Sequence, residues 1–180
     1  AATPSVMDHN GVGLMYQSVD PAKKFDTSAL PADQGLRNIA KALDVLMKES
    51  PVSAQKIKSL MKSGRVRLVY HPDNLRDSAA GSEAVALFRP DFLKNPAEHS
   101  RATTFIVVVG RHGVKWPTKE LAAVLAHELV GHGVQHQRAR LSNLRDVDAE
   151  CEAYMYEEIA NQDLARIIHG GAHKVTANVD

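Results

Sequence analysis

The chain has 180 residues, of which 44% are hydrophobic and 24% are charged, and its formal net charge at pH 7 is +1. These values are ordinary for one soluble globular domain with a sizeable core. A net charge this close to zero gives no general attraction to nucleic acid, and no apolar run approaches the length of a membrane span. The single cysteine, Cys151, excludes an internal disulfide bond.

The start of the chain is predicted to form an N-terminal arm over residues 1–30, because this stretch is rich in Gly, Pro, Ser and Asp and has no sustained period. We expect the arm to pack as an extended loop on a single domain that occupies residues 31–180. The chain starts Ala1-Ala2-Thr3-Pro4 without an initiator Met, which indicates either the end left by signal-peptide removal or an arbitrary boundary, and we prefer the first. A secreted or periplasmic location is therefore expected, with a cytoplasmic location as the alternative.

Two helices and three strands are predicted in the first part of the domain. Apolar periodicity predicts a helix over 32–49, and Pro51 begins a second helix that ends at Gly64. The expected strands are Arg65–Tyr70, Glu83–Phe88 and Thr103–Gly110. The last is a nearly continuous β-branched run and predicts a central strand, whereas the shorter second strand is bounded by glycine and proline and predicts an edge.

The next predicted helix carries the segment His127-Glu128-Leu129-Val130-Gly131-His132. In the common metalloprotease signature H-E-x-x-H the two histidines are four residues apart, about 40° around the helix. Here they are five apart, about 140° on a regular helix, so they cannot share one metal ion. Either the helix contains a one-residue π-bulge, or His132 is not a ligand. Gly131 favours the bulge, because glycine weakens a regular helix.

A last helix is predicted over 144–168, where Cys151, Met155 and Ile159 recur at four-residue intervals. Cys151 is expected to be a small buried side chain. The helix carries two candidate metal ligands, Glu150 and Glu152, about 200° apart, so only one of them can face the metal. Periodicity leaves the choice between them open.

Another candidate for the third ligand is His136, which follows His132 by four residues. This spacing suits a metal site on an unbroken helix. The competing interpretation, which we favour, is a histidine near the C-terminal end of a helix that interacts with the helix dipole.

The segment from His127 to His132 resembles the H-E-x-x-G-H motif of the dipeptidyl-peptidase III family of zinc peptidases, and Glu150-Cys151-Glu152-Ala153 resembles part of that family's E-E-C-R-A-E motif. The resemblance implies that His127, His132 and Glu150 bind Zn²⁺. The E-x-x-A pattern of the wider gluzincin group also selects Glu150. The resemblance covers only about thirty residues, so the family's exopeptidase specificity and two-lobed architecture are not carried over.

Two departures from the family are visible in the sequence. The family's separation between the two motifs is longer than the seventeen residues between His132 and Glu150. The family has an acidic residue four positions after the ligand, where this chain has Tyr154. A carboxylate that orients a ligand histidine must therefore come from elsewhere, and Asp146 and Asp148 are the nearest candidates.

Together these features predict a small α+β, zincin-like single domain, in which a short mixed sheet packs against an active-site helix and a ligand-bearing C-terminal helix. We expect a zinc-dependent metallopeptidase, with a peptide or protein substrate and Glu128 as the general base towards a zinc-activated water. The edge strand Ala84–Phe88 is expected to bind an extended peptide by strand addition. The candidate hydrogen-bond donors to the oxyanion that develops in the transition state are Tyr154, Tyr156, His136, His169 and His173.

Two alternative functions remain open from the sequence. One is a zinc amidohydrolase that acts on a non-protein or cell-wall peptide substrate by the same metal chemistry. The other is a non-catalytic, metal-stabilised binding or toxin module. The presence of Glu128 disfavours the second, because a structural zinc site is usually closed by four protein ligands and needs no base.

Overall fold

The computed structural model describes residues 6–17, 29–72, 85–92 and 103–168. In chain order, the elements up to the last strand are β1 (Val6–His9), β2 (Val12–Tyr16), α1 (Ala32–Glu49), α2 (Pro51–Ser63), β3 (Gly64–Tyr70), β4 (Ala86–Phe88) and β5 (Thr103–Val109). The elements that follow are η2 (Gly113–Lys115), α3 (Thr118–Leu125), η3 (Ala126–His132), α4 (Gly133–Gln137), η4 (Leu141–Asn143) and α5 (Asp146–Ile168). None of these helices is both long enough and apolar enough to cross a membrane.

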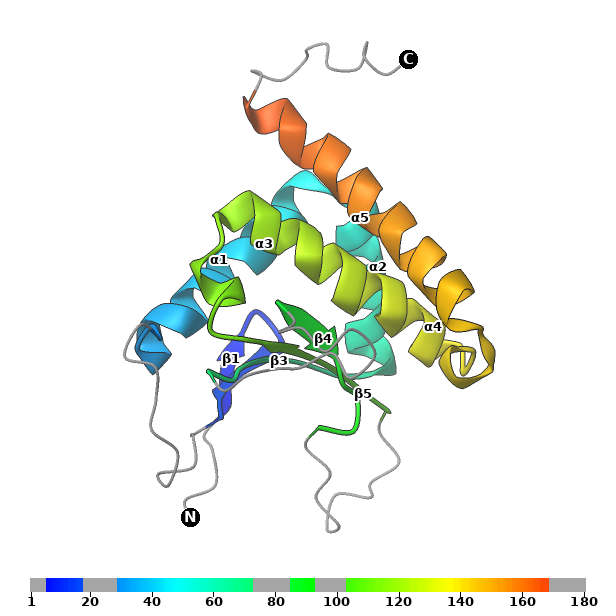
Figure 1. Ribbon diagram of the computed structural model, residues 1–180, viewed down its shortest axis with the longest axis horizontal. Helices are drawn as coiled ribbons and strands as arrows, with labels where there is room; N and C mark the ends of the chain where they lie inside the picture. The colour runs from blue at the N-terminus through cyan, green and yellow to red at the C-terminus, as the bar shows by residue number, and fades with distance from the viewer. Residues whose placement is uncertain (1–5, 18–28, 73–84, 93–102, 169–180) are drawn as a thin grey trace.

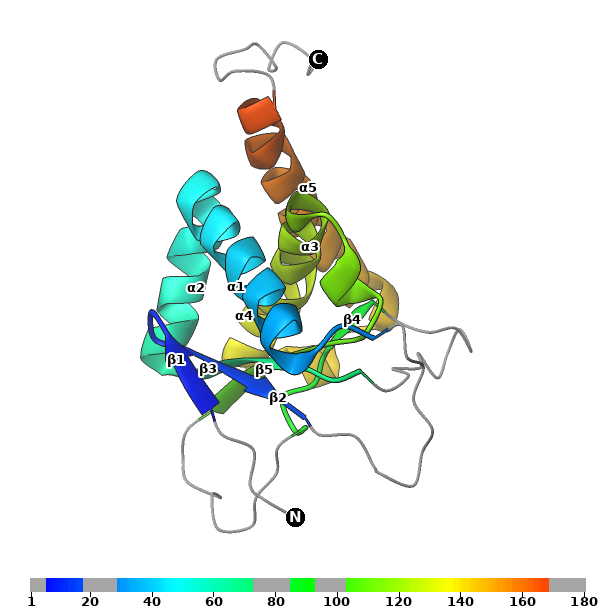
Figure 2. The ribbon, with the colours of Figure 1, turned by 90° about the vertical axis from the view of Figure 1, so that its left-hand side faces the viewer.

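The described residues form a small mixed α/β domain built on a five-stranded mixed sheet with the strand order β1-β2-β3-β5-β4. The three inner strands β2, β3 and β5 run parallel, and the two edge strands β1 and β4 are antiparallel to their neighbours. The long helices lie together over one face of the sheet (Figure 1). Seen from the side, α1 and α2 cover the half of the sheet that carries β1 (Figure 2).

The core lies between the helices and the sheet. Side chains alternate along the strands, so Leu68 and Val107 join the large cluster beneath the helices, whereas Val69 and Val108 join a smaller cluster on the opposite face. All four are essentially inaccessible to solvent. Burial on both faces explains why the second half of β3, residues 68–70, and most of β5, residues 105–109, are continuously apolar and lie inside the sheet.

Most of the predicted elements are present. The helices expected over 32–49 and from Pro51 are α1 and α2, and the strands expected at Arg65–Tyr70 and Thr103–Gly110 are β3 and β5. Strand β4 is an edge strand, as predicted, although the described strand begins only at Ala86. Strand β5 lies inside the sheet, but the middle position belongs to β3.

The expectation of an extended loop at the start of the chain is wrong for residues 6–16, which form the β1–β2 hairpin of the sheet. The two-residue turn between the strands is Asn10-Gly11, and both residues have positive φ, 52° and 90°. Asn-Gly is the sequence most typical of such a turn, because both residues tolerate the left-handed region. This dipeptide was the local signal for the hairpin.

The buried face of α5 also differs from the expectation. Cys151 is exposed rather than buried, and Met155 is 51% exposed. The residues that pack inwards are Ala149, Ala153, Ala160 and Leu164. The face is made mostly of alanine because α5 packs closely against the helix of η3, where larger side chains would not fit.

Gly131 is the point of closest approach between these two helices. A Cβ placed on residue 131 would lie 2.6 Å from Cα of Ala153 and 2.7 Å from its Cβ. Because the obstacle at Cα is backbone, a larger residue would have to push α5 away from η3. Gly131 is therefore required by helix packing as well as by the relaxed helix that the sequence predicts.

We expect Gly131→Ala to lower the free energy of unfolding by about 1–3 kcal/mol, because the added methyl overpacks the helix crossing. Thermal or urea unfolding followed by circular dichroism measures the change. The matched control is Gly133→Ala, where the new Cβ meets mainly the flexible Cδ1 of Leu60 at 2.9 Å. The control should change stability by less than about 1 kcal/mol. Equal effects of the two substitutions would contradict a backbone contact at residue 131.

Candidate metal centre

The two histidines lie on a π-helical segment, η3, which spans Ala126–His132 between α3 and α4. The predicted π-bulge is therefore confirmed. A π-turn closes with i→i+5 hydrogen bonds, so residues five apart return to one face of the helix. The rings of His127 and His132 are 5.2 Å apart between centroids, and both residues are buried, with exposed fractions of 5% and 7%.

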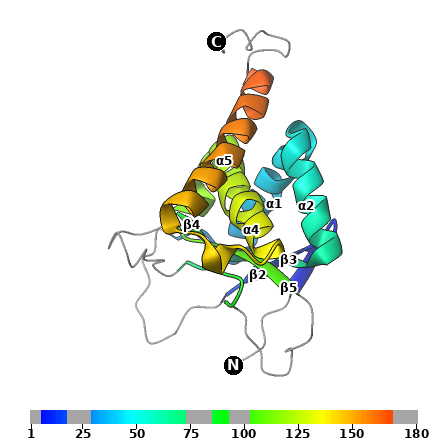
Figure 3. The ribbon, with the colours of Figure 1, turned by 90° about the vertical axis from the view of Figure 1, so that its right-hand side faces the viewer.

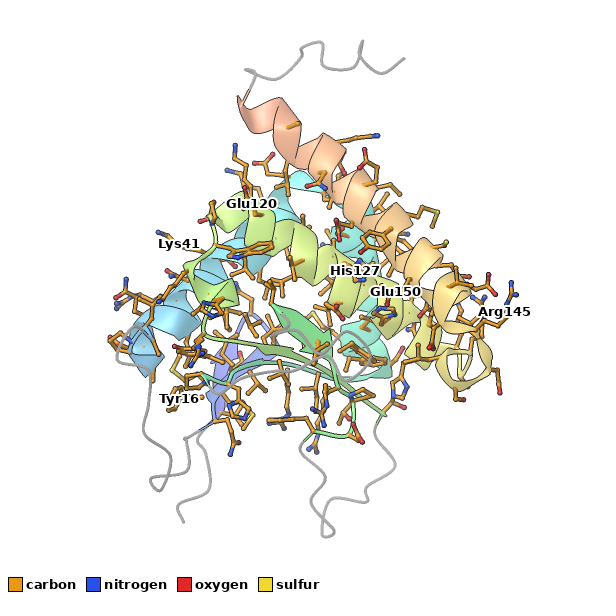
Figure 4. The ribbon with its side chains drawn as sticks, viewed as in Figure 1. Tyr16, Lys41, Glu120, His127, Arg145 and Glu150 are labelled. Carbon is orange, nitrogen blue, oxygen red and sulfur yellow. The ribbon has the colours of Figure 1, made fainter. Side chains whose placement is uncertain are left out.

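Glu150 on α5 faces both histidines. Its Oε2 lies 3.0 Å from Nε2 of His127, and its Oε1 lies 2.9 Å from Nε2 of His132. Figure 4 shows His127 and Glu150 pointing toward one another across the gap between the two helices. One donor atom from each of the three residues lies within 4.8 Å of the other two, so the group can hold one metal ion.

Glu152 lies on a different side of α5 and contacts Arg140 and Gln135 instead of the two histidines. Its Oε1 accepts a hydrogen bond of 2.9 Å from Arg140, and its Oε2 accepts one of 3.1 Å from Gln135. These hydrogen bonds, that from Arg140 above all, lower the pKa of Glu152 below its usual value. The structure thus brings Glu150 rather than Glu152 to the histidines.

Gln135 fixes the tautomer of His132. Its side-chain nitrogen donates to the carbonyl of Ala149 at 3.0 Å and to Glu152, both of which can only accept. The amide oxygen therefore faces Nδ1 of His132, at 2.9 Å, and Nδ1 must carry the proton. The lone pair of His132 is left on Nε2, which is the atom that faces Glu150.

A carboxylate, that of Glu157, also faces the second ring nitrogen of His127. Its Oε1 lies 3.0 Å from the buried Nδ1 of that ring, at ion-pair distance but outside hydrogen-bond geometry. The expectation that Asp146 or Asp148 supplies this carboxylate is wrong: Asp148 pairs with Arg145 at 2.8 Å, and Asp146 is exposed at the start of α5. Glu157 follows Glu150 by seven residues, about two helical turns, and this spacing was the available sequence signal.

Glu128 lies at the edge of the metal group and contacts the sheet. Its Oε1 is 3.9 Å from Nε2 of His127, and its Oε2 accepts a 2.9 Å hydrogen bond from the backbone N–H of Phe88 on β4. The side chain is 14% exposed. The carboxylate is therefore held beside the metal group by an edge strand, a contact that the sequence did not reveal.

The other candidate residues occupy distinct places. Tyr154 packs edge-on against His127, with 4.6 Å between ring centroids, and is 58% exposed. His136 is outside the metal group of the described residues and packs edge-on against Phe88 and Phe105 at 5.7 and 5.8 Å. Burial lowers the pKa of His136, which favours its neutral form. Tyr156 packs against the main core. The remaining candidates, His169 and His173, lie outside the described residues.

The chemistry of the donor set fits a first-row transition metal. Two imidazoles and one carboxylate form a set that Zn²⁺ takes in hydrolytic enzymes, and three protein ligands leave a coordination position for a small molecule. Comparison with known proteins adds no assignment: no protein-family model, no curated protein and no solved structure matches the chain.

We expect Glu157→Gln to weaken Zn²⁺ binding by about 10–100-fold, because an amide orients the His127 ring less strongly than a carboxylate does. Competition with a chromogenic chelator measures the dissociation constant. The matched control is Asp148→Asn, which changes an acidic residue of the same helix that pairs with Arg145 instead of with a histidine. The control should leave the affinity unchanged, and an unchanged affinity in Glu157→Gln would contradict the role given to Glu157.

Proposed function

We propose that the protein is a zinc-dependent metallopeptidase, in which His127, His132 and Glu150 hold the metal and Glu128 is the general base. The observation that carries this proposal is the position of the Glu128 carboxylate, 3.9 Å from the metal-facing nitrogen of His127 and not among the three grouped ligands. A purely structural metal site has no use for such a carboxylate, because its fourth ligand would come from the protein.

The bound metal would supply Lewis-acid chemistry, lowering the pKa of a water and polarising the carbonyl of the substrate. Glu128 then removes a proton from the water and delivers it to the amine that leaves. The N–H of Phe88 holds one carboxylate oxygen, which leaves the other directed at the metal group. Tyr154 is the nearer of the two proposed transition-state donors, since its ring touches His127, and His136 is the other.

The peptide substrate class is supported by the edge strand beside the site. The N–H of Arg89 donates to Ile106 and the carbonyl of Val85 accepts from Gly110, so these residues face β5. The backbone groups of Ala86 and Phe88 alternate with them and face the edge of β4 that has no partner strand among the described residues; of these groups, the N–H of Phe88 is already held by Glu128. An extended peptide can pair with that edge and so cross the metal group. A cell-wall peptide or another amide would use the same chemistry and is the alternative substrate class.

The proposal is tested by peptide hydrolysis with the wild type and with Glu128→Gln. The substitution keeps the shape of the side chain and removes its basicity, so we expect kcat to fall by about 10²–10⁴-fold while zinc content is retained. Mass spectrometry of a digested peptide mixture identifies the products, and elemental analysis measures the zinc. Retained activity in Glu128→Gln would contradict the role of Glu128, and a zinc-loaded wild type that cleaves cell-wall peptides alone would select the alternative substrate class.

A second prediction concerns the contact between β4 and Glu128. Phe88→Pro removes the N–H that holds the carboxylate, at an edge-strand position where no sheet hydrogen bond is lost. The matched control is Phe88→Ala, which also removes the ring but keeps the N–H. We expect kcat of Phe88→Pro to be lower than that of Phe88→Ala by about tenfold, with equal zinc content. Equal kcat values in the two variants would contradict a positioning role for the N–H.

A further inference from the structure

The outer face of α5 is apolar and exposed. We use this name for Val147, Cys151, Tyr154 and Met155, which recur three and four residues apart and so form one stripe along the helix. Val147 and Tyr154 are each 58% exposed and Met155 is 51% exposed, and Cys151 is also exposed. Helix α5 forms the outer wall of the molecule on this side (Figure 3).

Such clustering is unusual for a surface. Among the described residues the other exposed large hydrophobic side chains are Val6, Met7 and Trp116, which lie on β1 and directly before α3. Single exposed apolar residues are common and need no explanation, but a contiguous apolar patch marks a place where something binds. The outer face of α5 is therefore a candidate binding surface.

This face adjoins the metal group directly. Val147 and Tyr154 lie three residues before and four residues after Glu150, which are the positions next to it on the surface of a helix. The ring of Tyr154 also touches the ring of His127. A molecule bound at the metal group can thus continue onto the outer face of α5 without crossing a gap of polar residues.

The charged residues of α5 indicate which kind of molecule can bind there. Helix α5 has no lysine or arginine between Asp146 and Ala165, and Asp146 and Glu158 are exposed on it. Arg145, directly before the helix, pairs with Asp148. An acidic segment would meet mainly acidic side chains along the helix, whereas an apolar segment would bury the exposed hydrocarbon.

We infer that the preferred substrate is a peptide with a large apolar side chain next to the bond that is cleaved, and that this side chain lies on the outer face of α5. The inference rests on the proposed function, because it assigns a substrate preference to the same metal site. Tyr154 forms the part of the surface nearest the metal group, and Val147 and Met155 extend it along the helix.

The test first maps the bonds that the zinc-loaded full chain cleaves in a peptide mixture. Two quenched fluorescent peptides are then made that carry Leu or Ser beside the cleaved bond and are otherwise identical. We expect kcat/KM to favour the Leu peptide by about tenfold or more. The double variant Val147→Ser with Met155→Ser should lose most of this preference. The control, Gln162→Ser, changes an exposed polar residue of the same helix and should keep it.

The possible outcomes separate the inference from the proposed function. Cleavage without a preference for Leu, or an unchanged preference in the double variant, overturns the inference and leaves the peptidase intact. A dimer in solution that the double variant dissociates, with an unchanged preference, assigns the outer face of α5 to self-association and also overturns it. A zinc-loaded chain that cleaves no peptide in the mixture overturns both.

Discussion

His127 and His132 can serve one metal ion because the helix between them closes a turn with one extra residue. On a regular helix the two side chains would point about 140° apart, and no rotamer could bring both imidazoles to one ion. The π-helical segment from Ala126 to His132 removes this difference. The metal group, the placement of Glu128 and the choice of the third ligand all depend on this local geometry.

The close packing of α5 on the π-helical segment completes the site. Gly131 and Ala153 allow the two backbones to approach, which brings Glu150 within reach of both histidines. At its other end α5 is held by Asp163, whose buried carboxylate accepts a 2.8 Å hydrogen bond from Ser50 at the start of α2. The rotation of α5 about its axis is thereby set. The same rotation turns Glu157 towards His127 and leaves the larger apolar residues outside.

The parts of the structure that depend on local pattern were predictable from the sequence. Helices α1 and α2, the inner strands β3 and β5, and the bulge between the histidines follow from periodicity, β-branching and a spacing of five. The Asn10-Gly11 dipeptide indicated the hairpin, but the Gly, Pro, Ser and Asp content of residues 1–30 led to the prediction of a loop. The buried face of α5 was predicted wrongly because large apolar side chains are usually buried. Where α5 crosses η3 at Gly131, however, the two helices are so close that only small residues fit.

The contacts that orient the residues of the site were not predicted from the sequence. Gln135, Glu157 and the N–H of Phe88 act through the relative placement of separate elements, and in the last case through backbone that carries no sequence signature. The choice between Glu150 and Glu152 was likewise open from periodicity. It depends on how α5 is rotated, which is a property of helix packing and not of α5 alone.

The most direct measurement is the zinc content, by elemental analysis, of the wild type beside Glu150→Ala and Glu152→Ala. If the π-turn and the packing of α5 build the metal centre, the wild type holds about one zinc ion per chain, Glu150→Ala loses it, and Glu152→Ala keeps it. Loss of zinc from Glu152→Ala alone would mean that α5 is rotated differently. A wild type that binds no zinc even after reconstitution would contradict the metal centre itself.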